Sequence, residues 1–99
     1  MVSEAIVTLM LQKYPKLEIF GEDKYTAAKI VFCESSGNEK AKNKNSSARG
    51  LLQILYRLHK LPEDKLLTAD YNIEQGYKLY KQAKYTFKPW NSSRKCWSR

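Results

Sequence analysis

Apolar residues recur along most of the chain at the three- and four-residue spacing that is typical of α-helices. The first stripe ends near Pro15, because the residue before a proline is pushed out of helical backbone conformations. Its members are Val2, Ala5, Ile6, Leu9 and Met10. This pattern predicts an amphipathic N-terminal helix.

A second helix is predicted from about Asp23 to Ser36, with acidic residues at its start and Gly37 as a natural stop. Its apolar stripe is formed by Ala27, Ile30 and Val31. Residues 38–47 are polar, rich in Asn and Lys, and lack periodicity. They are therefore expected to form an irregular loop or a vestigial hairpin.

The second half of the chain predicts two further helices and a short one. A third helix is expected over residues 49–60, with Leu51, Ile54, Leu55 and Leu58 on one face. A fourth is expected from a cap at Asp70 to Ala83, and the aromatic, basic tail at 87–97 would hold one short helix after Pro89. The expected fold class is therefore mostly α, a single small domain over residues 1–99.

Charge narrows the class of partner but does not select one. The 99 residues contain 18 Lys and Arg against 10 Asp and Glu, a net charge of +8. Such a balance favours an anionic partner, which could be nucleic acid, acidic lipid or an anionic polymer such as the bacterial cell wall. No run approaches the roughly 20 apolar residues of a membrane span, so a soluble monomer that binds no membrane is expected.

Two cysteines and one histidine are too few for a zinc site, so neither a metal nor another cofactor is expected. Residues 1–11 lack the basic start and the cleavage site of a signal peptide. Without an export signal, Cys33 and Cys96 are expected to be free buried thiols, and a disulfide that closes a long loop is the alternative.

Glu34 is the residue that most strongly indicates chemistry. It occupies the next position on the apolar stripe of the second predicted helix, after Ile30 and Val31. A carboxyl group there is partly desolvated, which raises its pKa and suits it to donate a proton near neutral pH. The simpler alternative is an exposed glutamate in the last turn of an amphipathic helix.

Three segments that follow one another along the chain favour the proton-donating role of Glu34 over the exposed surface glutamate. They are Glu34-Ser35 at a helix end, Gly50-Leu51-Leu52-Gln53-Ile54, and Asn72-Ile73-Glu74-Gln75-Gly76. Together they resemble the catalytic domain of lytic transglycosylases and goose-type lysozymes over roughly residues 25–80. The resemblance implies a small lysozyme-like domain that cleaves the MurNAc–GlcNAc β-1,4 bond of peptidoglycan glycan strands.

The resemblance also implies roles for single residues. Glu34 would be the catalytic acid and base, with Ser35 beside it in the same motif as a substrate-binding residue. Gln53 would contact the sugar next to the scissile bond, and Asn43 would be the polar loop residue near the N-acetyl group. Asn72 and Gly76 would be structural, with Gly76 allowing close packing of its helix.

The end of the chain departs from the family pattern. The late Tyr-Asn-x-Gly segment of relatives is replaced by residues 87–91 and by Cys96-Trp97. The tyrosine that supports the catalytic glutamate in relatives is therefore assigned to Tyr80 first and to Tyr77 second, although core packing explains either. Trp90 could stack on a sugar ring or belong to the core.

The missing second carboxylate indicates the reaction type. Glycosidases usually place two carboxylates across the bond, but Glu39 is the only other acid between Glu34 and Gln53, and it is expected to be solvated. Transglycosylation to 1,6-anhydromuramic acid products is therefore expected. Hydrolysis by the same glutamate, with Asp64 or Asp70 orienting a water, is the close alternative.

Two other classes remain. The charge and the interleaved residues Tyr77-Lys78-Leu79-Tyr80-Lys81 would suit a nucleic-acid binder, although no known DNA-binding motif is present. A lysozyme-like binding module without activity is the other. If the protein is the enzyme, we expect it to bind no nucleic acid and to act on the periplasmic or extracellular cell wall. The lack of a signal segment then suits delivery by a phage, or excision from a longer precursor.

Overall fold

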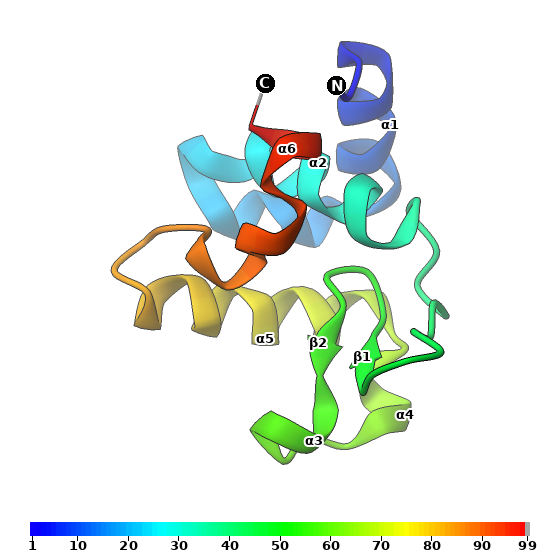
Figure 1. Cartoon of the computed structure of the whole chain (residues 1–99). Helices are drawn as coiled ribbons and strands as arrows, with labels where there is room; N and C mark the ends of the chain where they lie inside the picture. Colours follow the sequence, from blue (N-terminus) through cyan, green and yellow to red (C-terminus); the bar gives the residue numbers. More distant parts are fainter. Residues whose placement is uncertain (99) are drawn as a thin grey trace.

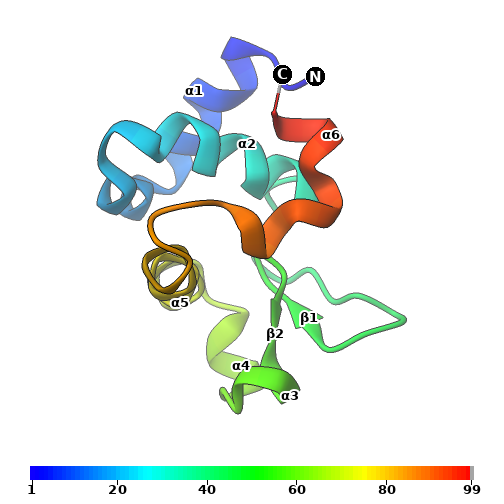
Figure 2. The same cartoon turned by 60° about the vertical axis from the view of Figure 1, so that its left-hand side comes forward.

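Helix α5 (Ala69–Gln82) runs between a group of helices and a small hairpin region (Figure 1). This computed structural model describes residues 1–98. The helical group consists of α1 (Glu4–Lys13), the 3₁₀ segment η1 (Pro15–Asp23), α2 (Lys24–Ser35), the 3₁₀ segment η2 (Lys88–Ser93) and α6 (Arg94–Trp97). The hairpin region consists of β1 (Ala48–Arg49), β2 (Ile54–Leu55), α3 (Tyr56–His59) and α4 (Glu63–Leu66). Figure 2 looks along α5 and shows η2 between α2 and the hairpin.

The prediction of a mostly α domain is confirmed, and α2 is its most accurate part. The helix lies within one residue of the expected range. Ala27, Ile30 and Val31 have no exposed surface and form the centre of the core, as their spacing predicted. The regular stripe therefore determines which face of α2 is buried. It also determines that Glu34, the next residue on that stripe, lies on the same side of the helix.

Helix α1 forms where it was expected, with its buried face turned slightly. The Ser3 side chain accepts a hydrogen bond from the backbone N–H of Ile6 at 3.2 Å and caps the helix. Val7 is buried, whereas Leu9 from the predicted stripe is 54% exposed. The helix ends before Pro15, but this proline then opens η1, because its fixed φ suits the first turn of a helix.

The predicted helix over residues 49–60 is wrong for its first half. Strands β1 and β2 pair antiparallel, with Ala48 opposite Leu55 and Arg49 opposite Ile54, and only α3 is helical. The hairpin therefore lies later than the expected position at 38–47. Leu58, which belonged to the predicted stripe, is 69% exposed.

The turn between the two strands explains the error. Gly50 has a φ of 77° and Gln53 a φ of 50°, and both angles are incompatible with a right-handed helix. Leu51 and Leu52 lie between them and are both buried in the core. A turn that buries two adjacent leucines produces the same local sequence pattern as one face of a helix.

Asn72 of α5 attaches this turn to the rest of the molecule, in the structural role expected for it. Its side chain is fully buried. Oδ1 accepts from the Leu52 N–H at 2.8 Å, and Nδ2 donates to the carbonyl oxygens of Arg49 and Leu66, both at 2.9 Å. A Cβ atom on Gly50 would lie 2.1 Å from the Leu66 oxygen, so only glycine fits beneath the amide.

Gly76 lets α5 approach the same turn closely, which confirms the packing role expected for it. A Cβ atom at Gly76 would lie 2.4 Å from Cδ1 of Leu52. Glycine costs roughly 1 kcal/mol in a helix interior relative to alanine. That cost is offset here by the burial of Leu52 against the helix backbone.

The start of α5 is capped from a distant segment. The Glu39 carboxylate accepts a hydrogen bond from the Ala69 N–H at 3.1 Å. Glu39 is therefore half-buried and structural, and the expectation that it is solvated is wrong. Asp70 lies inside the first turn and Thr68 is the cap residue, so the prediction of Asp70 as the cap is also wrong.

The tail folds back over α2 and is covalently fixed there. Cys33 and Cys96 form a disulfide, with their Cα atoms 6.0 Å apart, so the expectation of free thiols is wrong. The expectation of free thiols was based on the absence of an export signal. The pairing instead depends on the tertiary fold, in which the tail returns to the end of α2. Instead of one short helix, the tail contains η2 and α6.

We expect loss of the disulfide to destabilise the fold. The bond joins residues that are 63 positions apart. Closing such a loop lowers the conformational entropy of the unfolded chain, which stabilises the folded state by roughly 2–4 kcal/mol. The double variant Cys33→Ser/Cys96→Ser should lower the free energy of unfolding by that amount in urea titrations. A reductant should have the same effect on the wild-type protein and none on the variant. Equal unfolding midpoints for oxidised and reduced protein would contradict this.

Candidate active site

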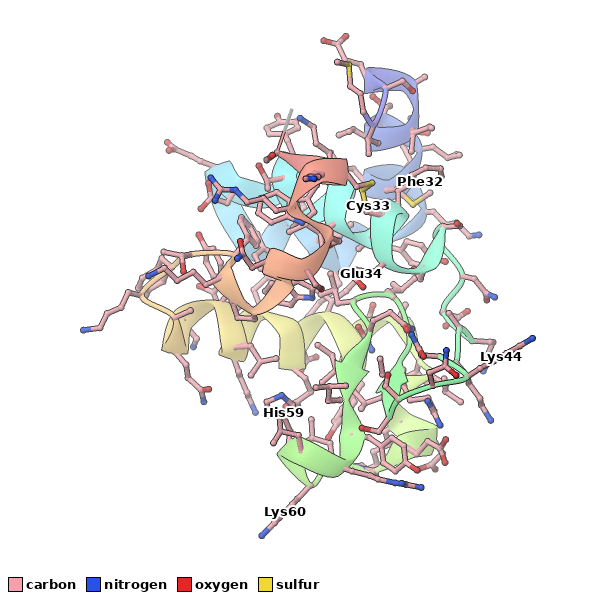
Figure 3. The ribbon with its side chains drawn as sticks, viewed as in Figure 1. Phe32, Cys33, Glu34, Lys44, His59 and Lys60 are labelled. Atoms are coloured by element: carbon pink, nitrogen blue, oxygen red, sulfur yellow. A yellow bond between two sulfur atoms is a disulfide. The ribbon has the colours of Figure 1, made fainter. Side chains whose placement is uncertain are left out.

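Glu34 lies in the last turn of α2 and points from the helix toward the hairpin (Figure 3). Its position directly after the buried stripe leaves the side chain half-buried. Burial raises the pKa of the Glu34 carboxyl above its usual value, and a hydrogen bond from Ser93 opposes the rise only in part. A carboxyl group with a raised pKa retains its proton closer to neutral pH and can donate it.

Ser93 in the tail contacts Glu34 directly. Its Oγ donates a hydrogen bond to Oε2 of Glu34 at 2.6 Å, and it accepts one from Nε1 of Trp97 at 3.1 Å. Sequence reasoning did not identify Ser93, because it searched for a tyrosine. The disulfide was the signal that could have found it, since pairing Cys33 with Cys96 places the tail next to Glu34.

A cleft of about 240 Å³ opens at the Glu34 side chain. It brings together four residues that the sequence singled out from three distant segments: Glu34, Asn43, Gln53 and Trp90. The other residues that line it are Ser46, Ala48, Leu55, Pro89 and Ser92. The cleft is therefore formed by the end of α2, the polar loop with the hairpin that follows it, and the tail.

Gln53 lies on the hairpin turn, with its amide held in place. Nε2 donates to the carbonyl oxygens of Gly50 at 2.9 Å and of Ala41 at 3.3 Å. Oε1 accepts no hydrogen bond from any residue in 1–98, and no buried side-chain oxygen in that range lacks a partner. This oxygen is therefore at least partly exposed and has no partner within residues 1–98.

Asn43 also lines the cleft, and bonds within its own loop hold it in place. Its Oδ1 accepts from the Asn45 N–H at 2.8 Å, and its backbone N–H donates to the Ala48 carbonyl at 3.1 Å. Arg49 adds a further bond, from Nη1 to the Asn43 carbonyl at 3.4 Å. The polar loop is thus ordered by local bonds although it lacks regular secondary structure.

Trp90 is a core residue that also lines the cleft. Only 4% of it is exposed, and its Nε1 donates to the Leu52 carbonyl at 2.8 Å. Both roles considered for Trp90 therefore involve the same ring. Its burial limits any contact with a ligand to the small part of the ring that is left uncovered.

The other expected site residues do not reach the cleft. Tyr77 and Tyr80 pack against Phe20 in an aromatic cluster, and the Tyr80 hydroxyl donates to the Asp23 carboxylate. Burial first, and then Asp23, raises the pKa of Tyr80 to about 12. The assignment of either tyrosine as the support of Glu34 is therefore wrong. Ser35 donates to the Val31 carbonyl at 2.9 Å within its own helix.

Glu34 is the only carboxylate among the residues that line this cleft. Glu39 is engaged at the start of α5. Asp64 and Asp70, which were considered as partners for a water, are exposed and do not line the cleft. An acid–base reaction here has one protein carboxyl group available.

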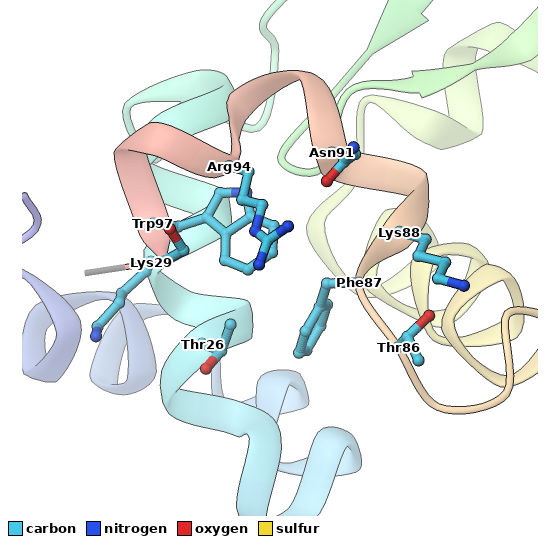
Figure 4. A pocket seen from close by; sticks show the side chains of 9 residues that line it. Thr26, Lys29, Thr86, Phe87, Lys88, Asn91, Arg94 and Trp97 are labelled. Atoms are coloured by element: carbon cyan, nitrogen blue, oxygen red, sulfur yellow. The ribbon is translucent and has the colours of Figure 1, made fainter.

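Among the larger cavities of the described residues, two lie between the tail and another segment. One, of about 410 Å³, shares Gln53, Leu55, Pro89 and Trp90 with the cleft and extends toward His59. The other, of about 440 Å³, lies between α2 and the tail (Figure 4). It is lined by Thr26, Lys29, Thr86, Phe87, Lys88, Asn91, Arg94, Trp97 and Ser98, a set without an acidic side chain.

Comparisons with protein-family models, with curated proteins and with solved structures gave no match. Among residues 1–98, no helix has the length and apolar content to cross a membrane. Within the same range, no group of three or more His, Cys, Asp or Glu side chains is arranged to hold a metal ion. The function of the cleft is therefore inferred from the chain's own residues.

We expect Glu34→Gln to stabilise the fold at neutral pH and to have no effect at acid pH. Burial raises the pKa of Glu34 in the folded state above its value in the unfolded chain. The free energy of unfolding therefore falls as the pH rises from the unfolded-state pKa through the folded-state pKa, and the neutral amide of the variant avoids this loss. The gain should be on the order of 1 kcal/mol or less for this half-buried group. Urea unfolding of both proteins at the two pH values measures it.

The matched control for this titration is Glu22→Gln, which changes an exposed carboxyl group. That variant relieves no burial and should follow the wild-type protein at both pH values. A Glu34→Gln variant that is equally stable or less stable at neutral pH would contradict the partial burial of Glu34.

Proposed function

We propose that this protein is a peptidoglycan-cleaving glycosidase of the lytic transglycosylase type, with Glu34 as its general acid and base. The observation that carries the proposal is the single carboxylate of the cleft, half-buried and with a raised pKa. The resemblance of the segments around Glu34, Gln53 and Asn72 to lysozyme-like enzymes supplies the substrate class. The cleft's position, where the first two of these segments meet, supports that reading.

One carboxyl group can serve the whole reaction if the substrate provides the nucleophiles. Protonated Glu34 donates its proton to the glycosidic oxygen as the C1–O bond breaks, and the N-acetyl carbonyl oxygen of the muramic sugar bonds to C1. The Glu34 carboxylate then removes the proton from the 6-hydroxyl of the same sugar. O6 bonds to C1, the N-acetyl oxygen leaves, and Glu34 is again protonated.

Gln53 and Asn43 are proposed to position the sugar. The partly exposed Oε1 of Gln53 can accept a hydrogen bond from an N–H or hydroxyl group of the substrate. Asn43, on the exposed rim of the cleft, offers its amide Nδ2 as a donor to an N-acetyl carbonyl oxygen. Both side chains are held by bonds to backbone atoms, which keeps the site prepared for binding.

The exposed lysines of the polar loop suit an anionic wall polymer. Lys40, Lys42 and Lys44 are all exposed, and the loop that carries them also contributes Asn43 to the cleft. Cationic side chains beside a cleft raise the local concentration of a polyanion and its rate of association. The net charge of +8 is thereby explained without a nucleic acid.

Two alternatives are less well supported. Hydrolysis by Glu34 needs a water that a second group orients, and neither Asp64 nor Asp70 lines the cleft. Nucleic-acid binding through residues 77–81 needs accessible rings, but Tyr80 is buried and Tyr77 packs against it.

We expect the activity to depend on Glu34. On purified cell walls, Glu34→Gln should lower the rate of muropeptide release by at least about 100-fold, since general acid catalysis contributes about 10²–10⁴-fold. Glu22→Gln, which changes an exposed carboxyl group that does not line the cleft, should retain the wild-type rate. Equal release by wild-type and Glu34→Gln protein, or none by either, would refute the proposal.

The products should identify the reaction. We expect mass analysis of the released muropeptides to show termini lighter by one water than the hydrolysis product, because O6 replaces water at C1. Ordinary reducing ends would instead assign a lysozyme with the same acid. If no muropeptide is released and DNA retains the protein in a salt-sensitive manner, the nucleic-acid alternative is favoured.

A further inference from the structure

The Ser93 hydroxyl lies among three polar groups and has one hydrogen to donate. Its Oγ is 2.6 Å from Oε2 of Glu34, 3.2 Å from the Trp90 carbonyl oxygen and 3.1 Å from Nε1 of Trp97. Trp97 can only donate, whereas Glu34 and the Trp90 carbonyl can both accept. The single hydroxyl hydrogen can therefore bond to only one of the two acceptors at a time.

The charge on Glu34 determines which acceptor receives the Ser93 hydrogen bond. When the carboxyl group is ionised, it attracts the hydroxyl hydrogen in a charge-assisted bond, which the 2.6 Å separation fits. When Glu34 carries its proton on Oε2, it becomes the donor to Ser93 Oγ. The hydroxyl then turns to the Trp90 carbonyl, the local acceptor three residues back that serine commonly uses.

The indole of Trp97 keeps both arrangements fully bonded. Its Nε1 lies 3.1 Å from Ser93 Oγ and 3.3 Å from the Trp90 carbonyl oxygen. When Ser93 turns toward Glu34, the Trp90 carbonyl retains this N–H as a partner. Neither protonation state therefore leaves a polar group of the cluster without a hydrogen bond.

We propose that Ser93 is a positioning residue that supports Glu34 in both protonation states, turning between the Glu34 carboxylate and the Trp90 carbonyl while Trp97 holds its oxygen in place. The proposal rests on the proposed function, since only a group that acts as acid and then as base needs a hydrogen-bond partner in both states. Among residues 1–98, Ser93 is the one side chain that hydrogen-bonds Glu34.

The tail keeps this arrangement rigid. The Cys33–Cys96 disulfide joins the neighbours of Glu34 and Trp97, so both ends of the cluster share one covalent link. The Trp97 ring also packs edge-on against Phe87, with ring centroids 5.9 Å apart, and Figure 4 shows the two side by side. Ser93 can rotate its hydroxyl while its backbone stays fixed.

The test is a titration of the Glu34 carboxyl by ¹³C NMR in the full, disulfide-bonded protein, with Glu34→Gln used to assign the signal. Ser93→Ala should raise the pKa of Glu34 by about one unit, because the charge-assisted bond to the ionised form is stronger than the bond to the protonated form, and both are lost. Ser93→Thr keeps the hydroxyl and should titrate as the wild type does. Trp97→Phe removes only the N–H donor from the cluster and should give a smaller rise.

Ser92→Ala is the matched control. Ser92 is the neighbouring serine and lines the cleft, but it makes no hydrogen bond to Glu34, so the titration should be unchanged. In wall-cleavage assays, the alkaline limb of the pH profile should move up by the same shift in Ser93→Ala. A merely structural role for Ser93 would lower the rate at every pH and leave the limb where it was.

Two results overturn the proposal: a Glu34 titration in Ser93→Ala that matches the wild type, or a Ser93→Thr titration that matches Ser93→Ala. If Ser93→Ala does not fold, the Ser93→Thr and Trp97→Phe titrations still decide. Failure of the proposed function is distinguishable from this, because the titration needs no substrate. Wild-type protein that releases no muropeptide while its variants titrate as expected refutes the enzyme and leaves only the hydrogen-bond arrangement of Ser93 supported.

Discussion

The buried side chain of Asn72 is the constraint on which the cleft depends. Three hydrogen bonds from one amide fix the hairpin turn to α5 and to the segment before it. A buried amide without partners costs about 1–3 kcal/mol per unsatisfied group, so this network is stable only when the turn is present. The hairpin turn places Gln53 in the lining of the cleft together with Glu34, so the cleft depends on Asn72, a residue that does not line it.

The second requirement is that three distant segments meet at one carboxyl group. Helix α2 supplies Glu34 because its apolar stripe ends there, and the tail supplies Ser93 because the disulfide returns it to the same helix end. A small domain has little core with which to hold a tail, and the covalent link replaces part of it. The result is a site whose support comes from backbone carbonyls and one hydroxyl group instead of a second acid.

Regular stripes made α2 predictable, and Glu34 with it, because periodicity alone determines which side of a helix is buried. The same reasoning failed at residues 49–55, where positive φ angles at Gly50 and Gln53 interrupt what looks like a helical pattern. Contacts between distant residues were not accessible either. Glu39 capping α5 and Ser93 bonding to Glu34 depend on tertiary placement, which no local pattern encodes. Tyr80 was misassigned because its role was carried over from the family that the sequence resembles, whereas here the ring fills the core.

Both tryptophans of the chain hydrogen-bond to segments that form the walls of the cleft: Trp90 to the Leu52 carbonyl of the hairpin turn, and Trp97 to Ser93 of the tail. No tryptophan elsewhere contributes a background signal. The intrinsic fluorescence of the unmodified protein therefore reports on this one region. Emission will follow opening of the turn or of the tail without an attached dye, which makes the cleft directly observable in solution.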